Sequence, residues 1–262
     1  MTSSKLTRIS SRDNPLLVRL RKLARHPGEY RKLGQLLLEG EHLCQAWVAR
    51  GDAPALQALV TETAWQAGRH AVLAEAAAAT VVVADAAMAE LSSLETSPPV
   101  SFVVSLPAAP PLCPDAPSVV LDRIQDAGNV GSILRSAAAF GFTQVIALEG
   151  TASLWSPKVL RAGMGAHFGL GLIENGRIEL LDGLTLPLVG TSSHATATLA
   201  EAIGGPCAWV FGNEGAGASA AAQARCARVV RIPQPGGEES LNVAAAAAIC
   251  LHASAAASAP AQ

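Results

Sequence analysis

Three polar segments of the sequence carry side chains that could bind a ligand or take part in catalysis. In "LDRIQDAGNVGSILR" (121–135), Asn129 is suited to cap a helix, and Arg135 comes two turns into that helix. A guanidinium in this place either lays its stem over apolar neighbours or offers its donors to a phosphate. The first segment therefore combines a helix start with a candidate phosphate ligand.

The second segment is a glycine-containing loop with an acid in its middle. In "WVFGNEGAGAS" (209–219), Glu214 stands between Gly212 and Gly217. Gly212 would let a ligand approach the backbone closely, and the N–H groups of the loop could face that ligand. Because the spacing is not GxGxxG, the glycines alone are weak evidence for a nucleotide site.

The third segment is polar and runs directly into an alanine-rich stretch. In "RIPQPGGEESLN" (231–242), Ser240 and Asn242 stand just before "VAAAAAICL". Serine and asparagine are common helix N-caps, so capping by itself explains these two residues as well as ligand binding does.

The elements around these segments predict that all three meet at one edge of a sheet. Apolar β-type runs alternate with helical stretches in the second half of the chain: strands at 118–124, 143–150, 186–192, 207–212 and 227–232, and helices at 129–140 and from Pro157. Continuous apolar strands between helices indicate a parallel sheet covered on both faces. Ligands of such sheets bind beyond the carboxyl ends of the strands, where the three segments begin.

A proline-rich passage divides the chain into two domains. "SLPAAPPLCPDAPS" (105–118) holds five prolines, which deny both helix and central strand. Before it, helices at 16–25, 41–50 and 63–78 and strands at 56–62 and 80–85 predict a small α/β domain. We therefore expect an α/β protein with a domain at 1–106, a linker at 107–117, a parallel-sheet domain at 118–254 and a disordered tail at 255–262.

Basic residues are concentrated at the amino terminus although the net charge is only −2. Residues 1–32 hold nine of the 19 lysines and arginines against two acids. Such an arm is typical of nucleic-acid binding, with a merely solvated basic helix as the alternative. The candidate RNA-binding residues are Arg8, Arg12, Arg19, Arg21 and Lys22.

The cysteines and the apolar runs indicate a cytoplasmic protein without a metal or a membrane span. Five cysteines are scattered with no CxxC and no histidine at ligand spacing, which argues against a disulfide framework and a structural zinc. The start "MTSSKLTRIS" has no apolar core of a secretory signal. The longest uncharged apolar stretch, 243–251, is far shorter than the ~20 residues of a membrane helix.

In combination the three segments resemble the SpoU (TrmH) family of RNA ribose 2′-O-methyltransferases, in the SPOUT superfamily. The first motif of that family is matched by Asn129, Gly131, Arg135, Phe140 and Gly141, the second by Gly212, Glu214, Gly215 and Gly217, and the third by Ile232, Pro233, Ser240, Leu241, Asn242 and Val243. The family often has a proline before the first asparagine, where this chain has "DAGN". Residues 9–43 resemble, more loosely, the substrate-binding domain that precedes this catalytic domain.

The resemblance implies a fold with a trefoil knot, a cofactor and a partner. S-adenosylmethionine would be the methyl donor, held at Thr191, Gly212, Ile232 and Leu241 by backbone groups. RNA would be the substrate, with ribosomal RNA of the 23S type favoured over transfer RNA. The alanine-rich helix would pack in the knot and in a homodimer interface of the C-terminal domain.

The resemblance also implies roles for the polar residues. Arg135 would act on the ribose hydroxyl, either as the base assisted by an RNA phosphate or by gripping that phosphate while phosphate or water takes the proton. A guanidinium is a poor base, so both accounts stay open. Asn129 and Asn242 would orient the ribose or Arg135, Ser240 would join the same cluster, and Glu214 would anchor its loop or pair with an arginine.

Two other classes of protein remain as alternatives. A nucleotide-binding dehydrogenase would need a glycine fingerprint after its first strand, and "LDRIQDAGNVGS" does not supply one. A non-catalytic RNA-binding protein of the same fold would lack motif side chains, and here all of them are present.

Overall fold

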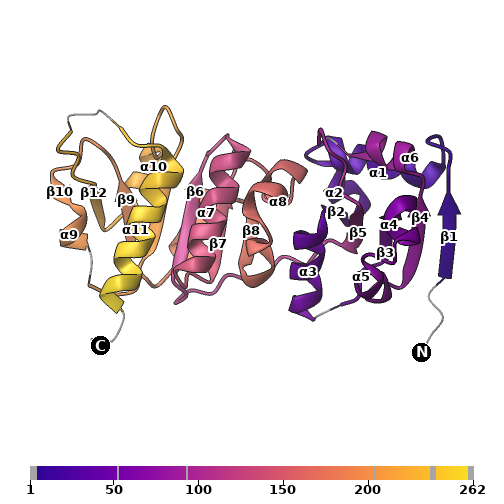
Figure 1. Cartoon of the computed structure of the whole chain (residues 1–262). Coiled ribbons are helices and arrows are strands. Elements are labelled where there is room, and N and C mark those ends of the chain that lie inside the picture. The colour runs from indigo at the N-terminus through magenta and orange to yellow at the C-terminus, as the bar shows by residue number, and fades with distance from the viewer. Residues whose placement is uncertain (1–4, 52, 93, 203, 237–239, 259–262) are drawn as a thin grey trace. The chain divides into compact units, whose positions relative to one another are not determined.

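The structure is a computed structural model that describes residues 5–51, 53–92, 94–202, 204–236 and 240–258 (Figure 1). The chain forms two compact units. The amino-terminal unit contains the residues up to Ala108 together with Trp155–Phe168, and the carboxyl-terminal unit contains Ala109–Leu154 and the residues from Gly169 onward. The first division falls inside the predicted proline-rich linker, but the sequence did not predict that residues 155–168 group with the amino-terminal unit.

The amino-terminal unit is built on a mixed five-stranded sheet. Its elements are β1 (Lys5–Ile9), α1 (Pro15–Arg25), α2 (Glu29–Leu33), β2 (Gln35–Glu39), α3 (Glu41–Arg50), β3 (Gln57–Thr61), α4 (Glu62–Gln66), α5 (Ala71–Glu75), β4 (Ala79–Val83), α6 (Asp85–Leu91) and β5 (Val100–Ser105). The strand order is β1-β4-β3-β5-β2. Strands β1, β4 and β3 run parallel, and β5 pairs antiparallel with both β3 and β2.

From Lys5 onward, the basic amino-terminal residues are part of this fold and do not form a free arm. Strand β1 pairs in parallel with β4, and Leu17, Leu20 and Leu23 of α1 are buried. The sequence missed β1 because charged residues interrupt its apolar pattern. The expected helix at 63–78 is also wrong, because Gly68 and His70 adopt left-handed backbone angles that separate α4 from α5.

Contacts within the amino-terminal unit explain why it includes residues 155–168. The helix α8 (Pro157–Gly163) places Arg161 beside the buried Glu39, with 3.1 Å between Nη1 and Oε2. The hydroxyl of Ser92 donates to the other oxygen of Glu39 at 2.6 Å. Phe168, in the 3-10 helix η1 (Ala166–Gly169), meets the Trp47 ring edge-on with 5.4 Å between centroids. A buried carboxylate needs such partners, so this segment completes the core of the amino-terminal unit.

The carboxyl-terminal unit is built on a fully parallel seven-stranded sheet. Its elements are β6 (Ser118–Asp122), α7 (Ala127–Ala139), β7 (Gln144–Leu148), β8 (Gly171–Gly176), η2 (Ile178–Gly183), β9 (Leu188–Thr191), β10 (Ala197–Thr198), α9 (Leu199–Ala202), β11 (Ala208–Gly212), α10 (Ala220–Gln223), β12 (Arg228–Arg231) and α11 (Val243–Ser258). The strand order is β10-β12-β9-β11-β6-β7-β8. The predicted parallel sheet is thereby confirmed.

Both faces of this sheet are covered, as continuous apolar strands require. Val120 and Val210 pack on one face with Leu181 of η2 and Ala222 of α10. On the other face, the indole N–H of Trp209 donates to Ser254 of α11 at 2.9 Å, and α11 packs against both β11 and α7. Adjacent residues of a strand point to opposite faces, which explains why β11 serves both layers.

Two parts of the carboxyl-terminal unit differ from the sequence prediction. Strand β8 was missed because "GLIENG" contains only two large apolar residues and lies at the sheet edge. The tail expected to be disordered from residue 255 is helical as far as Ser258, because α11 continues through its alanines; residues 259–262 lie outside the described residues. None of the helices in the described ranges has the length and hydrophobicity of a membrane-spanning segment.

The register of the strands brings their carboxyl ends together. Asp122, the last residue of β6, lies opposite Gly212, the last residue of β11. Thr191 at the end of β9 lies opposite Val230 of β12. The three polar segments therefore start from one edge of the sheet.

Candidate functional site

The first polar segment begins α7, but Asn129 is not its cap. Asp126 holds that position, and its Oδ1 accepts a hydrogen bond from the backbone N–H of Asn129 at 2.8 Å. The expectation that Asn129 caps the helix is therefore wrong. Because the N-cap position is taken, the side chain of Asn129 is free to interact with the other loops.

The third segment does begin its helix with an asparagine cap. The Oδ1 of Asn242 accepts from the N–H groups of Ala244 at 2.9 Å and Ala245 at 3.3 Å. Its Nδ2 donates to Oδ1 of Asn129 at 3.0 Å. Asn242 thus caps α11 with one end of its amide and holds the first segment with the other.

The second segment supplies the acceptor on which these contacts converge. The carboxylate of Glu214 accepts from Asn129 Nδ2 at 3.1 Å, from the N–H of Asp126 at 3.1 Å and from the N–H of Gln125 at 3.2 Å. Burial raises the pKa of Glu214, but the hydrogen bonds from Asn129, Asp126 and Gln125 outweigh burial and leave the pKa below its ordinary value. Glu214 is therefore an anionic anchor at neutral pH.

The chemistry of each group fixes the direction of this hydrogen-bond chain. Asn242 must present its amide nitrogen to Asn129, because its oxygen caps α11. Asn129 then offers its oxygen to Asn242 and its nitrogen to Glu214, which, as a carboxylate, can only accept. Each group thus constrains the next, and the chain links all three segments.

Asn213 and Gly212 shape the loop that carries Glu214. Oδ1 of Asn213 accepts from the N–H groups of Gly215 and Ala216, and its backbone pairs with Gly217 in both directions. A Cβ atom at Gly212 would lie 1.9 Å from the backbone nitrogen of Ala218. Gly212 is thus required by the packing of its own loop, a reason for glycine that the sequence did not reveal.

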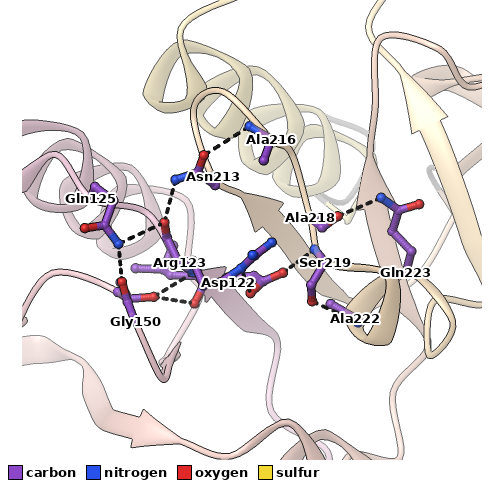
Figure 2. A network of polar contacts seen from close by, with 12 residues as sticks. Asp122, Arg123, Gln125, Gly150, Asn213, Ala216, Ala218, Ser219, Ala222 and Gln223 are labelled. Atoms are coloured by element: carbon purple, nitrogen blue, oxygen red, sulfur yellow. Dashed lines mark hydrogen bonds and ion pairs between the residues drawn. The ribbon is translucent and has the colours of Figure 1, made fainter.

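Further contacts tie this loop to the end of β6 (Figure 2). Buried Asp122 accepts from the backbone N–H of Ser219 and from Nε of Arg123. The Nδ2 of Asn213 donates to the carbonyl of Arg123 at 2.9 Å. Asp122, Arg123 and Asn213 were not among the predicted site residues, although an asparagine before "EGAG" is a typical Asx-turn residue.

Two predicted catalytic residues lie outside the hydrogen-bond chain. Arg135 and Ser240 are exposed, and their side chains make no hydrogen bond or ion pair within the described residues. The Cα of Arg135 lies about 9 Å along α7 from that of Asn129. Helical side chains lean toward the N-terminus of their helix, which for α7 is the end that follows the carboxyl end of β6.

The predicted cofactor residues lie at or after neighbouring strand ends. Gly212 and Thr191 end β11 and β9, and Ile232 directly follows β12. Leu241 is exposed just before α11. The Oε1 of Gln234, two residues after Ile232, is buried without a hydrogen-bond partner in the described structure, as expected of an acceptor that a ligand satisfies.

Acidic residues of the amino-terminal unit pair with three of the predicted RNA-binding cations. Arg8 pairs with Glu62 at 3.5 Å, whereas Arg12 and Arg21 both pair with Glu90, at 3.3 and 3.8 Å. Two cations of α1, Arg19 and Lys22, are exposed and have no ion-pair partner among the described residues.

Three cysteines of the carboxyl-terminal unit, Cys207, Cys226 and Cys250, are unsuited to nucleophilic catalysis. Burial raises the pKa of Cys207 and Cys226 to about 11 and that of Cys250 to about 12. These thiols stay protonated at neutral pH, and the thiolate is the nucleophilic form.

Comparison with known proteins gives consistent matches. Residues 116–252 match the model of the SpoU rRNA Methylase family. A Synechocystis protein with the name of an uncharacterized tRNA/rRNA methyltransferase is 34% identical, over 95% of this chain and 94% of its own. A Bacillus subtilis protein named as a 23S rRNA guanosine 2′-O-methyltransferase is 28% identical, over 86% of this chain and 90% of its own.

A solved structure extends this likeness to three dimensions. The SpoU methyltransferase AviRb from Streptomyces viridochromogenes, in complex with the cofactor AdoMet, has a TM-score of 0.80 and 27% sequence identity. The match covers 93% of this chain and 97% of that structure.

The packing around Gly212 predicts that it cannot be replaced by alanine. Gly212→Ala would force the backbone of Ala218 away, and we expect the melting temperature to fall by about 5 °C or more. Gly215→Ala is the matched control, because its added Cβ would be no closer than 3.8 Å to another residue. The control should melt within about 2 °C of the parent by calorimetry. Equal melting temperatures for the two variants would contradict the packing argument.

The Asn129–Glu214 contact predicts a pH effect of known sign. Asn129→Asp places two carboxylates together, which raises one pKa of the pair. The loss of stability is therefore present above that raised pKa and fades as the pH falls through it. Amide exchange at Gln125 and Asp126 should be faster than in an Asn175→Asp control at pH about 8 and approach the control near pH 5. A difference that does not shrink on acidification would rule out the contact.

Proposed function

The chain belongs to the SpoU rRNA Methylase family, and on that premise we propose that it transfers a methyl group from S-adenosylmethionine to a ribose 2′-hydroxyl of RNA. The observation that carries the proposal is the hydrogen-bond chain from Asn242 through Asn129 to Glu214. It gathers the three segments that resemble the family motifs at the carboxyl edge of a parallel sheet, where such sheets bind ligands.

Ribosomal RNA of the 23S type is the substrate that we favour. The Bacillus subtilis relative is named for a guanosine of 23S rRNA, and the name of the Synechocystis relative leaves transfer RNA as the second candidate. In the amino-terminal unit, Arg19 and Lys22 are placed on the outside of α1 and would bind RNA phosphates. Arg8, Arg12 and Arg21 would contact RNA only while they are also paired with Glu62 or Glu90.

The cofactor would bind among the ends of β9, β11 and β12. S-adenosylmethionine supplies a methyl group that is already activated by its sulfonium. Backbone groups at Thr191, Gly212, Ile232 and Leu241 would hold it. At Gly212 these would be the backbone polar groups, because the loop itself fills the space where a Cβ atom would lie. The unpartnered Oε1 of Gln234 fits a ligand that bears a hydrogen-bond donor, such as an adenine amino group.

The protein's own side chains would align the hydroxyl with the methyl group. Arg135 would bind the phosphate beside the acceptor ribose and polarise the hydroxyl. A guanidinium remains protonated in proteins, so we assign the proton to that phosphate or to water. Asn129 and Asn242 would position Arg135 and the ribose, Ser240 would hydrogen-bond in the same cluster, and Glu214 would hold the loops in register.

A second copy of the chain is the partner that we propose for α11. The uncovered face of this helix carries Ala245 and Ile249, the latter 39% exposed, beside a buried face at Ala247 and Leu251. A homodimer through the carboxyl-terminal unit would cover these apolar residues. We further propose a cytoplasmic location and the trefoil knot that the family resemblance implies.

Methyl transfer to unmodified RNA tests the proposed function. The protein, labelled S-adenosylmethionine and separate transcripts of 23S rRNA and transfer RNA should yield a labelled 2′-O-methyl nucleoside from the ribosomal transcript. Label on a base, or none while the cofactor still binds, would contradict the proposed reaction. Arg135→Ala should lower the transfer rate by about 100-fold or more, since it removes the group that binds the phosphate and polarises the hydroxyl.

The Arg135 variant needs controls for folding and for charge. S-adenosylmethionine affinity, measured by calorimetry, should stay within about twofold of the parent, because the side chain of Arg135 makes no hydrogen bond or ion pair with the described residues. Arg225→Ala removes one arginine at the opposite edge of the sheet and should retain the parent rate. A rate near that of the parent for Arg135→Ala would remove Arg135 from the mechanism.

A further inference from the structure

The residue that follows β6, Arg123, has a backbone conformation that arginine rarely adopts. Its φ angle is +61°, in the left-handed region that favours glycine, asparagine and aspartate. The first residue after a strand at the carboxyl edge of a parallel sheet stands where ligands bind. An arginine that is kept in a strained conformation at such a place points to a role for its side chain.

Hydrogen bonds from neighbouring segments hold this conformation (Figure 2). The N–H of Arg123 donates to the hydroxyl of Thr151 at 3.0 Å, and that hydroxyl donates to the carbonyl of Leu121 at 2.9 Å. The carbonyl of Arg123 accepts from Nδ2 of Asn213 at 2.9 Å and from the side chain of Gln125 at 3.5 Å. The backbone of Arg123 is therefore fixed relative to the loop that carries Glu214.

The side chain of Arg123 is fixed as well. Its Nε donates to Oδ1 of buried Asp122 at 3.2 Å. Its stem passes over Gly150, where an added Cβ would lie 3.2 Å from Cγ of Arg123. The side chain is nevertheless 43% exposed, and neither Nη atom has a partner among the described residues.

A role in neutralising the charge of Asp122 does not account for the way in which Arg123 contacts it. An arginine whose role is to pair with a carboxylate tends to use two nitrogens, as Arg225 does with Asp182, through Nε at 2.7 Å and Nη2 at 3.2 Å. Arg123 gives Asp122 only Nε, because the other carboxylate oxygen accepts from Ser219. Asp122 thus orients a guanidinium whose two Nη groups remain available to a ligand.

We propose that Arg123 binds a phosphate of the RNA substrate, at a subsite distinct from Arg135. The proposal rests on the proposed function and adds a specific RNA contact to it. Two Nη groups in a fixed plane match two phosphate oxygens. Arg123 lies close in sequence to the candidate site, because the N–H groups of Gln125 and Asp126, two and three residues further along, donate to Glu214. Arg123 would therefore bind a phosphate near the acceptor nucleotide.

Substitutions at Arg123 test the proposal through RNA affinity and its salt dependence. Arg123→Asn keeps a residue that tolerates the left-handed backbone and removes the guanidinium. For an unmodified 23S rRNA transcript, we expect about tenfold weaker binding, with the slope of log affinity against log salt reduced by about one phosphate contact. Arg123→Lys keeps the charge, so it should bind RNA more weakly than the parent but keep the parent slope.

Two controls distinguish an RNA phosphate contact from a general charge effect and from a contact with the cofactor. Arg225→Asn removes an arginine at the amino edge of the same sheet and should leave affinity and slope unchanged. The affinity of the Arg123 variants for S-adenosylmethionine should match that of the parent. A loss confined to that affinity would mean that Arg123 binds the carboxylate of the cofactor and would overturn the proposal.

The remaining outcomes are also decisive. Parent-like RNA affinity and slope in Arg123→Asn, while the parent methylates the transcript, would overturn the subsite and leave the proposed function intact. Absence of RNA binding and methyl transfer in the parent would overturn both. Equal loss of RNA affinity in Arg123→Asn and Arg225→Asn would show a general charge effect and contradict the subsite.

Discussion

The site depends on one interaction, the acceptance by the carboxylate of Glu214 of three hydrogen bonds from the start of α7. The donors are the N–H groups of Gln125 and Asp126 and the side chain of Asn129, and a fourth, longer hydrogen bond comes from the neighbouring Asn213 at 3.4 Å. A carboxylate offers only acceptors, so it imposes a direction on Asn129 and, through it, on Asn242. One anionic side chain thereby sets the relative positions of three segments from distant parts of the sequence.

The parallel sheet makes this interaction available. Register places the last residues of β6 and β11 opposite each other, so the loops that follow them start as neighbours. Gly212 and Asn213 then turn the second loop back on itself, and Asp122 secures its far end at Ser219. Arg123 lies in the same group of contacts. Its left-handed backbone conformation is held by Asn213, which also shapes the loop of Glu214.

The sequence predicted the parallel sheet, because apolar runs are a local signal. It also pointed to Asn129, Glu214 and Asn242 as candidate site residues, because motif spacing is local as well. The pairing of Asn129 with Asn242 joins residues 113 positions apart and depends on where two helices begin, so no local pattern contains it. The position of Asp126 as the cap of α7 could be read only from the backbone. Likewise, the charged residues of β1 interrupt the apolar pattern from which a strand would be predicted. No local sequence pattern indicates that Arg161 pairs with Glu39 and completes the core around it.

The central claim is that Asn242, Asn129 and Glu214 act as a unit, and a double-mutant cycle tests it most directly. Asn242→Ser retains a capping oxygen for α11 and loses the donor to Asn129, whereas Asn129→Ala removes the middle member. Methyl-transfer kcat/KM is measured for both single variants and the double variant. We predict that the double variant is no slower than the more impaired single variant, a coupling of about 1.4 kcal/mol or more. Losses that multiply, as expected of independent residues, would contradict the account.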